Sequence, residues 1–340
     1  MNNFKIGNLR VDRESPAIII AEAAVEHLGN LHAAKRMADA ALECGADVIK
    51  YQMHLPEHEM LKGRIKFWGG SLDEILENYN LSVEGHKELI QYCETIGIQY
   101  LCTPFCPEAV KILDDLGVVG FKTGSGELTN FPLMEEISKT GKPVIVSSGM
   151  STEDEIENTV NFLKQRDVDF AITHCTSIYP SPYSAINLRY IKTLQEKFKV
   201  HSGHSDHTPT MWTAIGAVSY GAKIIEKHFT LSKSLKGPDF EVSLEPNDFK
   251  TMVKAIRAVE AATGTGKKEI LKDEKVVREW AHHSIVTIKN VEKGDVFSFE
   301  NLSVKRPGDG LPSSMLPKIL GKIAVKDVHV DKQLTLEDVF

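Results

Sequence analysis

The strongest constraint on the fold is an alternation that runs through about the first 265 residues of the chain. Apolar runs typical of buried strands are each followed by a segment whose apolar residues recur at helical spacing. Residues 17–23, A-I-I-I-A-E-A, are the first such run, and apolarity on both faces predicts a strand within a parallel sheet. Apolar residues then recur three and four positions apart from Ala34 to Ala41, on a helix that Asn30 can cap. We count eight strands of this kind, each followed by a helix.

Eight βα units in a stretch of this length predict an α/β protein whose strands close into a (β/α)8 TIM barrel. A doubly wound open sheet is the alternative architecture. The first strand lacks the G-x-G-x-x-G turn that a dinucleotide-binding sheet of that kind carries, which favours the barrel. Between residues 53 and 82 the sequence around Trp68, Gly69 and Gly70 is polar and irregular. We expect a long loop there, of the kind that covers or serves a site.

The pattern changes near residue 265. Residues 1–265 are predicted to form the barrel, and the charge-rich residues 266–282 a linker with one helical turn. Residues 283–340 predict a small β-rich domain in which short strands are separated by turns. Because fewer than about 60 residues bury only a thin core, we expect this domain to pack on another surface. Its strand-like pieces are residues 284–288, 296–299 and 302–305.

The bulk composition excludes several classes of protein. The net charge is −7 and no basic block stands out, so nucleic acid is not an expected partner. No apolar run reaches the roughly 18 residues that span a bilayer, and the N-terminal residues lack the apolar core of a signal peptide. The five cysteines are odd in number and have no metal-finger spacing. We therefore expect a cytoplasmic protein with reduced thiols and no membrane association.

Two histidine-bearing stretches accompany the last two predicted strands of the barrel. His207 lies in H-S-G-H-S-D-H-T and His228 in I-I-E-K-H-F-T. Two imidazoles at neighbouring strand ends can hold one divalent metal, with Asp206 and Glu226 as outer acidic groups or charge balance. The plainer alternative is a set of ordinary polar residues at the rim of a sheet. Two nitrogens without a thiolate cluster predict an open site, suited to Mn²⁺, or to Mg²⁺ or Co²⁺.

Other polar residues fall at the carboxyl ends of the predicted strands, where the catalytic groups of such barrels lie. Lysines, hydroxyls and the backbone amides of G-S-G-E, residues 124–127, are what a phosphate group needs, although that run alone also fits a tight turn. Glu22 can act as a general base or stabilise charge, or it can be a buried carboxylate paired with Lys50 or Lys122. The full set is Glu22, Lys50, Gln52, Thr103, Lys122, Ser125, Glu127, Ser148, His174, Ser177, Tyr179, Ser205, His207 and His228.

These motifs together resemble those of the sialic acid synthase family. Its members are phosphoenolpyruvate-condensing barrels with a C-terminal antifreeze-like (SAF) domain. The resemblance covers nearly the whole chain and rests on a series of motifs in order rather than on any single one. The matching runs are I-I-I-A-E (18–22), G-A-D-V-I-K-Y-Q (45–52), C-T-P-F (102–105), F-K-T-G-S-G-E (121–127), S-S-G-M (147–150), H-C-T-S-I-Y-P (174–180), G-H-S-D-H-T (203–208), E-K-H-F-T (226–230), K-G-P-D (236–239) and V-K-R-P-G-D-G (304–310).

The resemblance implies roles for individual residues. His207 and His228 match two metal-binding histidines, usually with Mn²⁺, and Glu22 matches a catalytic carboxylate. Arg306 matches an arginine that reaches from the small domain into the barrel of the partner subunit, which implies a domain-swapped homodimer. Residues that hold phosphoenolpyruvate are matched by Lys50, Thr103, Lys122, Ser125 and Ser205, and the acylamino-sugar pocket by Gln52, Tyr179 and Asp239. We count Lys50 and Lys122 as catalytic and add Glu127 and Ser177 to the substrate-binding set.

Two departures from the family pattern bear on the sugar. The usual N-H-N-G after the first strand is E-H-L-G here, so Glu26 replaces an amide and changes the charge near the site entrance. Ser177 stands where bacterial members often have Asn. Both affect which sugar is expected more than which reaction.

The resemblance implies an N-acetylneuraminate (sialic acid) synthase. Such a transferase condenses phosphoenolpyruvate with N-acetylmannosamine, or a close acylamino-sugar, to a nine-carbon 3-deoxy-2-keto acid with release of phosphate. The alternative within the family is a legionaminic- or pseudaminic-type synthase that uses a diacetamido-trideoxy hexose. A metal-dependent aldolase that takes pyruvate would need no phosphate site. A sugar- or ice-binding protein, suggested by the small domain alone, would leave the lysines and histidines without a purpose.

Overall fold

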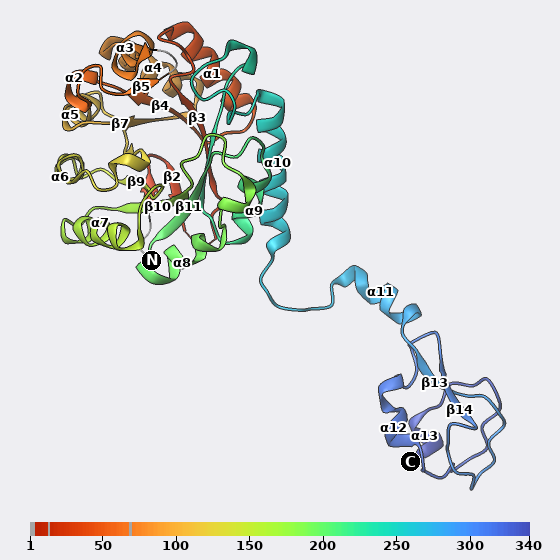
Figure 1. Cartoon of the computed structure of the whole chain (residues 1–340). Helices are drawn as coiled ribbons and strands as arrows, with labels where there is room; N and C mark the ends of the chain where they lie inside the picture. The colour runs from red at the N-terminus through yellow and green to blue at the C-terminus, as the bar shows by residue number, and fades with distance from the viewer. Residues whose placement is uncertain (1–3, 13, 68–69) are drawn as a thin grey trace. The chain divides into compact units, whose positions relative to one another are not determined.

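The computed structural model describes residues 4–12, 14–67 and 70–340, and they form two compact units. The first unit ends at Gly264 and the second runs from Thr265 to Phe340 (Figure 1). Within the described ranges, no helix is long and apolar enough to cross a membrane.

The first unit is built on a parallel eight-stranded sheet, whose hydrogen-bonded order is β7-β4-β3-β12-β11-β10-β9-β8. The last strand of this sheet in sequence, β12, pairs with the first, β3, and the two ends of the order are the consecutive strands β7 and β8. This arrangement confirms the predicted (β/α)8 barrel. The strands are β3 (Ile18–Ala24), β4 (Val48–Met53), β7 (Gln99–Pro104), β8 (Phe121–Lys122), β9 (Val144–Ser147), β10 (Phe170–Cys175), β11 (His201–Asp206) and β12 (Ile224–His228).

Helices surround the sheet, and each buries one apolar face against it (Figure 1). The predicted face of the first helix is confirmed, since Ala34 and Ala41 are among its buried residues and the Asn30 side chain accepts a hydrogen bond from the Ala33 amide. Thr152 and Glu155 form a capping box at the start of α7. The helices are α1 (Leu31–Glu43), α4 (Val83–Ile96), α5 (Pro107–Asp115), α6 (Phe131–Lys139), α7 (Glu153–Gln165), α8 (Arg189–Phe198), α9 (Trp212–Ser219) and α10 (Pro246–Thr263).

The two faces of β3 show how the sequence orients the site. Ile19 and Ala21 belong to the large core between sheet and helices, whereas Ile18 and Ile20 belong to a second core inside the barrel. The hairpin of β1 (Phe4–Ile6) and β2 (Leu9–Val11) also contributes to this inner core. Because side chains alternate along a strand, Glu22 continues the inner face one step beyond Ile20.

The segment between β4 and α4 is more regular than the sequence predicted. It contains α2 (Pro56–Glu59), β5 (Lys66–Phe67), β6 (Gly70–Ser71) and α3 (Leu72–Tyr79) instead of one irregular loop. The Asp73 carboxylate accepts a hydrogen bond from the Gly63 amide at 3.1 Å, so a partly buried polar contact organises this segment where apolar periodicity is weak. Trp68 and Gly69, at the centre of the expected loop, lie outside the described residues.

The second unit has its own small core, which includes Ile285, Phe297 and Leu302. Its antiparallel pair of β13 (Ser284–Thr287) and β14 (Leu302–Lys305) matches two of the three strand-like pieces. Residues 296–299 form a single bridge, Val296 with Ile323, instead of the expected strand. Helix α11 (Lys272–Ala281) is ten residues long where one turn was expected. Two short helices, α12 (Leu316–Ile319) and α13 (Leu336–Val339), complete the unit.

Candidate active site

Strand register brings the predicted polar residues to one level inside the barrel. Glu22 stands opposite His228 on β12 and opposite Lys50 on β4. Gln52 is paired with Thr103 on β7, and Ser205 on β11 with Glu226 on β12. The carboxyl ends of parallel strands converge at one end of a closed barrel, so residues more than 200 positions apart in the sequence become neighbours.

Two lysines and two glutamates form a buried charged cluster at this level. Lys50 Nζ lies 2.7 Å from Glu22 Oε2 and 3.8 Å from Glu226 Oε2. Lys122 Nζ lies 3.6 Å from Glu226 Oε1. Lys50 also donates to Thr103 Oγ1 at 2.9 Å. The pairing of Glu22 with Lys50 that the sequence left open is thus present. Glu226, expected as an outer acidic group or charge balance beside the histidines, lies between the two ammonium groups.

The electrostatics of the cluster distinguish its two carboxylates. Burial raises the pKa of Glu22 to about 7, although Lys50 opposes the shift. Burial acts on Glu226 in the same direction, but Lys122 and Lys50 outweigh it and the pKa of Glu226 is lowered. Burial lowers the pKa of Lys122, while the two glutamates overcome burial and raise the pKa of Lys50. Glu226 is therefore the carboxylate that balances the lysines, and Glu22 is the group poised to exchange a proton near neutrality.

Hydroxyl groups line the neighbouring part of the barrel mouth. Ser205 Oγ donates to Glu226 Oε1 at 2.8 Å, and Ser125 Oγ lies 2.9 Å from Ser147 Oγ. A Cβ atom placed on Gly149 would lie 2.3 Å from Ser177 Oγ and 2.5 Å from Ser125 Oγ. The bare backbone of Gly149 therefore leaves room for the Ser125 and Ser177 hydroxyls.

Glu127 follows Ser125 in a single 3-10 turn, η1 (Ser125–Glu127). Its carboxylate lies against Gly124, since a Cβ atom on that glycine would meet Glu127 Oε2 at 2.3 Å. Burial raises the pKa of Glu127 to about 7. The G-S-G-E run is thus both a tight turn and a source of polar groups at the barrel mouth.

His207 and His228 lie side by side with ring centroids 5.2 Å apart. His207 Nδ1 is 2.9 Å from the Thr176 carbonyl oxygen, which favours a proton on Nδ1, and Nε2 is 3.0 Å from the Tyr179 hydroxyl. The Tyr179 ring stacks on His207 at 4.1 Å. Asp239 Oδ2 lies 3.4 Å from His228 Nδ1.

These contacts fit an open metal site of two imidazoles. A carbonyl on one ring nitrogen of His207 leaves the other nitrogen with its lone pair, as a metal ligand requires. His228 Nδ1 is buried and lacks a hydrogen-bond partner. In the part of the chain that the structure describes, no cluster of three or more His, Cys, Asp or Glu side chains is arranged to hold a metal. The donor set therefore suits a weakly held, substrate-completed ion and not a closed structural zinc site.

Several expected participants lie elsewhere. Asp206 faces away from the barrel interior, because side chains alternate along a strand and its neighbour His207 faces the site. Its carboxylate accepts a hydrogen bond from the Thr213 hydroxyl at 2.7 Å. His174 Nε2 lies 2.5 Å from the Ile186 carbonyl oxygen and His204 Nδ1 lies 3.1 Å from the His174 carbonyl oxygen, so both rings have structural partners. Ser148 donates to the Thr173 carbonyl oxygen at 3.0 Å.

Arg306 belongs to the second unit and is placed by contacts within it. Its Nε donates to the Ala281 carbonyl oxygen at 3.1 Å, and its guanidinium lies 5.7 Å from the centre of the Trp280 ring. Its expected reach into the barrel of a partner subunit stays a prediction.

The sequence did not identify two further groups at the site, the His54 imidazole and the Cys175 thiol. Gln52 Nε2 donates to Glu22 Oε1 at 3.0 Å, while Gln52 Oε1 lies 3.0 Å from His54 Nε2. His54 Nδ1 is in turn 2.9 Å from Glu59 Oε2, so this chain of contacts orients the Gln52 amide. Cys175 Sγ lies 3.6 Å from His207 Nδ1. Polar residues one or two positions beyond a strand end were the signal that could have identified His54.

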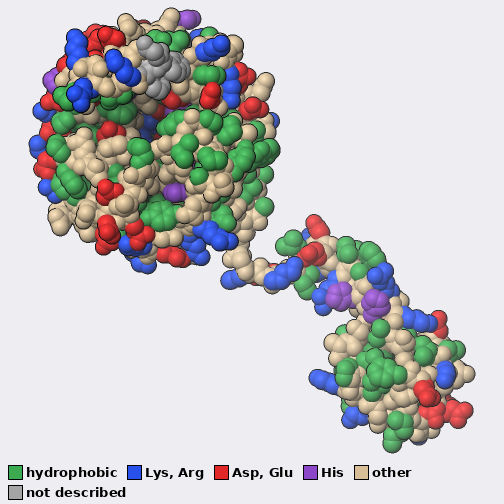
Figure 2. Space-filling model, in the orientation of Figure 1, with side chains coloured by type: hydrophobic (Ala, Val, Ile, Leu, Met, Phe, Trp, Pro, Cys, Tyr) green, Lys and Arg blue, Asp and Glu red, His purple; other side chains and the backbone are tan. Residues whose placement is uncertain are grey.

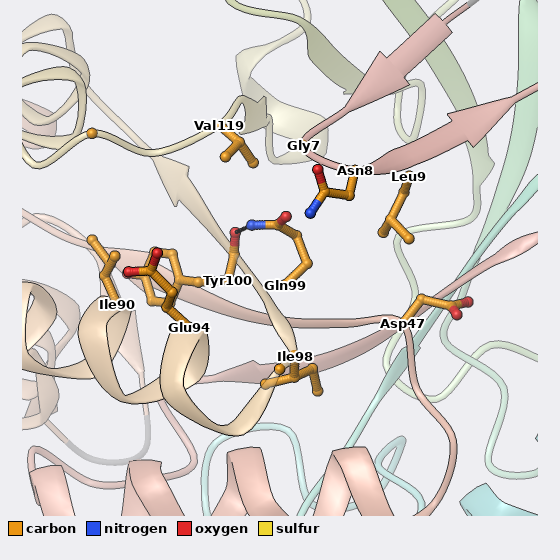
Figure 3. A pocket seen from close by; sticks show the side chains of 12 residues that line it. Gly7, Asn8, Leu9, Asp47, Ile90, Glu94, Ile98, Gln99, Tyr100 and Val119 are labelled. Atoms are coloured by element: carbon orange, nitrogen blue, oxygen red, sulfur yellow. Dashed lines mark hydrogen bonds between the residues drawn. The ribbon is translucent and has the colours of Figure 1, made fainter.

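A separate pocket of about 390 Å³ lies at the amino ends of the strands. Three residues that line it lie at the starts of strands: Asp47 precedes β4, Gln99 begins β7 and Val119 lies two residues before β8. Figure 3 shows the amide side chains of Asn8 and Gln99 in this pocket, with Gln99 Nε2 donating to the Tyr100 carbonyl oxygen at 3.2 Å. The pocket is thus at the opposite end of the barrel from the lysines and histidines.

The fold and the site define a (β/α)8 barrel enzyme with a lysine-rich anion site beside a pair of histidines. Comparison with known proteins narrows this class. The model of the NeuB family matches residues 37–268, and that of the SAF domain matches residues 282–339. The chain therefore belongs to the NeuB family, the sialic-acid-type synthases, and carries a C-terminal SAF domain.

Individual relatives cover nearly the whole chain. The N,N'-diacetyllegionaminic acid synthase of Campylobacter jejuni is 37% identical over 93% of this chain and 98% of its own length. The human N-acetylneuraminate-9-phosphate synthase is 33% identical over 96% of this chain and 94% of its own. Among solved structures, the N-acetylneuraminic acid synthetase of Leptospira borgpetersenii, in complex with citrate, has a TM-score of 0.75 and 30% identity, covering 81% of this chain and 95% of that one.

Proposed function

We propose that this enzyme condenses phosphoenolpyruvate with an open-chain acylamino-sugar of the mannosamine type and releases inorganic phosphate. The observation that carries the proposal is the buried cluster of Lys50, Lys122 and Glu226 at the same barrel mouth as His207 and His228. A metal-dependent aldolase that takes pyruvate has no phosphate group to bind, whereas phosphoenolpyruvate needs both the lysines and the hydroxyls.

The lysine side of the mouth suits phosphoenolpyruvate. Lys50 and Lys122 can neutralise its phosphate and carboxylate, and Thr103, Ser125 and Ser205 can donate hydrogen bonds. Glu226 and Glu22 oppose the effect of burial on the pKa of both lysines, which favours their ammonium forms before the substrate arrives.

The histidine side suits a divalent cation, for which we propose Mn²⁺. His207 and His228 would be its protein ligands, with substrate or water oxygens completing the shell. Such an ion would act as a Lewis acid that polarises the sugar aldehyde. Gln52, Tyr179 and Asp239 surround this position and can bind the hydroxyl and acylamino groups of the sugar.

The proposed reaction forms one bond between carbons and breaks one bond between carbon and oxygen. C3 of phosphoenolpyruvate attacks the aldehyde carbon, water adds at C2, and phosphate leaves with C–O cleavage. Glu22, held by Lys50 and Gln52, is placed to assist the water or to balance the positive charge that develops at C2. The product is a nine-carbon 3-deoxy-2-keto acid.

The choice of sugar substrate to test first rests on similarity to the relatives described above. The higher identity to the legionaminic-type relative supports a diacetamido-trideoxy mannose as the first substrate to test. N-acetylmannosamine, expected from the sequence, is supported by the match to the solved sialic acid synthetase.

We also propose that the enzyme works as a homodimer. Helix α11 exposes Val276 at 67% and Trp280 at 54% of their accessible surface within the second unit. Figure 2 shows hydrophobic side chains on the surface of this segment. Apolar side chains gathered on one short helix are typical of a subunit interface. Sedimentation analysis of the full chain tests this, with Trp280→Ser expected to weaken the dimer.

The reaction is tested by phosphate release from phosphoenolpyruvate with Mn²⁺. N-acetylmannosamine, its 6-phosphate and the diacetamido-trideoxy mannose are compared in parallel. Release with one sugar, lost on adding a chelator and restored by Mn²⁺, is the expected result. No release with any of the three would contradict the proposed function.

A further inference from the structure

Asp239 enters the site from a loop, whereas the other site residues described above lie on or next to strands. It lies in the loop between η3 (Lys233–Leu235) and α10, and its carboxylate ends 3.4 Å from His228 Nδ1. Contacts within the loop fix the backbone after Asp239, since its carbonyl oxygen accepts the Val242 and Ser243 amides, each at 3.1 Å, and the Ser243 hydroxyl at 2.9 Å. These bonds shape the loop but do not attach it to the barrel.

Glu26 supplies an attachment from the turn after β3, the strand that pairs with β12. In this turn its own amide donates to the Ala23 carbonyl oxygen at 2.9 Å. Glu26 Oε1 accepts the Asp239 amide at 2.7 Å across 213 residues of sequence. Glu26 is 4% exposed and is therefore an internal support for the loop. The sequence had instead suggested a charge near the site entrance.

Gly237 makes this contact possible. A Cβ atom on Gly237 would lie 2.2 Å from Glu26 Oε2, 2.5 Å from Cδ and 2.6 Å from Oε1. The loop backbone therefore packs directly on the carboxyl group, and only glycine leaves room for it. Burial raises the pKa of Glu26 to about 7, partly opposed by the hydrogen bond from Asp239, so the group accepts that bond at the cost of desolvation.

We propose that Glu26 is a positioning residue for the sugar half of the site, which holds the loop of residues 236–243 so that Asp239 lies beside His228. This inference rests on the proposed function only for the identity of the group that Asp239 binds. The contact itself is independent of the substrate. Glu26 touches no reacting atom in this arrangement and acts through the Asp239 backbone.

The first test measures the loop without any substrate. Hydrogen–deuterium exchange of the full chain should show faster exchange across residues 236–243 in Glu26→Ala than in the wild type, with the strands of the barrel unchanged. Glu26→Gln keeps an acceptor oxygen for the Asp239 amide and should exchange like the wild type. Unchanged exchange in Glu26→Ala would overturn the proposal, even if the proposed reaction were itself wrong.

The second test separates the two substrates. Glu26→Ala should raise KM for the sugar about 10-fold or more and change KM for phosphoenolpyruvate less than about twofold. Glu26→Gln should recover most of the loss. Equal increases in both KM values would indicate general disruption of the barrel and overturn the positioning role. Failure of the wild-type enzyme to release phosphate with any sugar would contradict the proposed function and leave the exchange experiment to decide the loop contact.

A double-variant cycle with Gly237 tests the packing of the loop on the Glu26 carboxyl group. Gly237→Ala should mimic Glu26→Ala, because the new methyl group displaces the carboxyl group. Once residue 26 is alanine the obstruction is gone, so adding Gly237→Ala should cost little more. A double variant whose loss equals the product of the two single losses would show that the residues act separately and would refute the contact.

Discussion

Asp206 and Lys227 form an ion pair with no exposed side-chain surface, in which Lys227 Nζ lies 3.5 Å from Asp206 Oδ2. The pair joins β11 to β12 on the outer face of the barrel, directly behind the inward-facing His207 and His228. Lys227 Nζ also donates to the Thr208 carbonyl oxygen at 2.5 Å. The two strand ends that present the histidines are thereby tied together from outside.

Breaking this pair should destabilise the barrel. Lys227→Met leaves a buried carboxylate without its counter-ion and is expected to lower the free energy of unfolding by about 3–5 kcal/mol. Asp206→Asn should act in the same direction, and the double variant should lose less than the sum of the two. Urea unfolding measures this, with the exposed pair of Lys305 and Asp331 as control, where Lys305→Met should cost less than about 1 kcal/mol. A loss at Lys227 as small as the control would refute this account.

Removing either histidine should abolish metal-dependent activity while the fold survives. His207→Ala and His228→Ala each remove half of the proposed protein ligand set, so Mn²⁺ binding, measured by equilibrium dialysis, should weaken at least about 100-fold. Thermal unfolding should still be cooperative. His32→Ala, at an exposed histidine of α1, is the matched control and should bind Mn²⁺ like the wild type. Activity that persists in metal-free buffer would contradict the metal assignment.

Adding one methyl group at Gly149 should impair the phosphate side of the site. The Cβ atom would lie within 2.5 Å of both the Ser125 and Ser177 hydroxyls, so Gly149→Ala must displace them. We expect KM for phosphoenolpyruvate to rise about 10-fold or more. Gly126→Ala is the control for the added methyl group itself, because it keeps the backbone amide of the G-S-G-E run and no atom lies within 4 Å of the Cβ position there. Identical kinetics in the two variants would argue against a role for these hydroxyls.

Acid should destabilise the barrel partly through His86. Burial, with smaller effects from His27 and His54, lowers the pKa of His86 to about 3, and its Nδ1 lies 2.8 Å from the Tyr100 hydroxyl. The unfolded chain binds a proton near pH 6.5 that the folded chain refuses until about pH 3. Stability is therefore fully present above pH 6.5 and falls as the pH drops below it, by about 1.4 kcal/mol per pH unit for one such histidine. His86→Gln should flatten the dependence of urea unfolding on pH between 6 and 4, whereas an unchanged slope would contradict this.

The sequence by itself determined the order of elements and the kinds of residue at their ends. The helical spacing from Ala34 to Ala41 and the cap at Asn30 are local features, and the structure reproduces both. Because parallel strands present their carboxyl ends on one side, polar residues such as Lys50 and Lys122 could be placed together without coordinates. Hydrophobic periodicity reflects burial over a few neighbouring residues, so the helices and strands could be predicted from the sequence.

Tertiary structure alone decided the facing of each side chain and the long-range contacts. Asp206 and His207 are adjacent in sequence, yet one faces the helices and the other the barrel interior, since a shift of one residue reverses the face of a strand. The sequence did not show that Glu226 would stand between two lysines, or that Glu26 would hold the backbone of Asp239. These contacts depend on strand register and on the meeting of segments that lie about 200 residues apart in the sequence, and no local pattern encodes either.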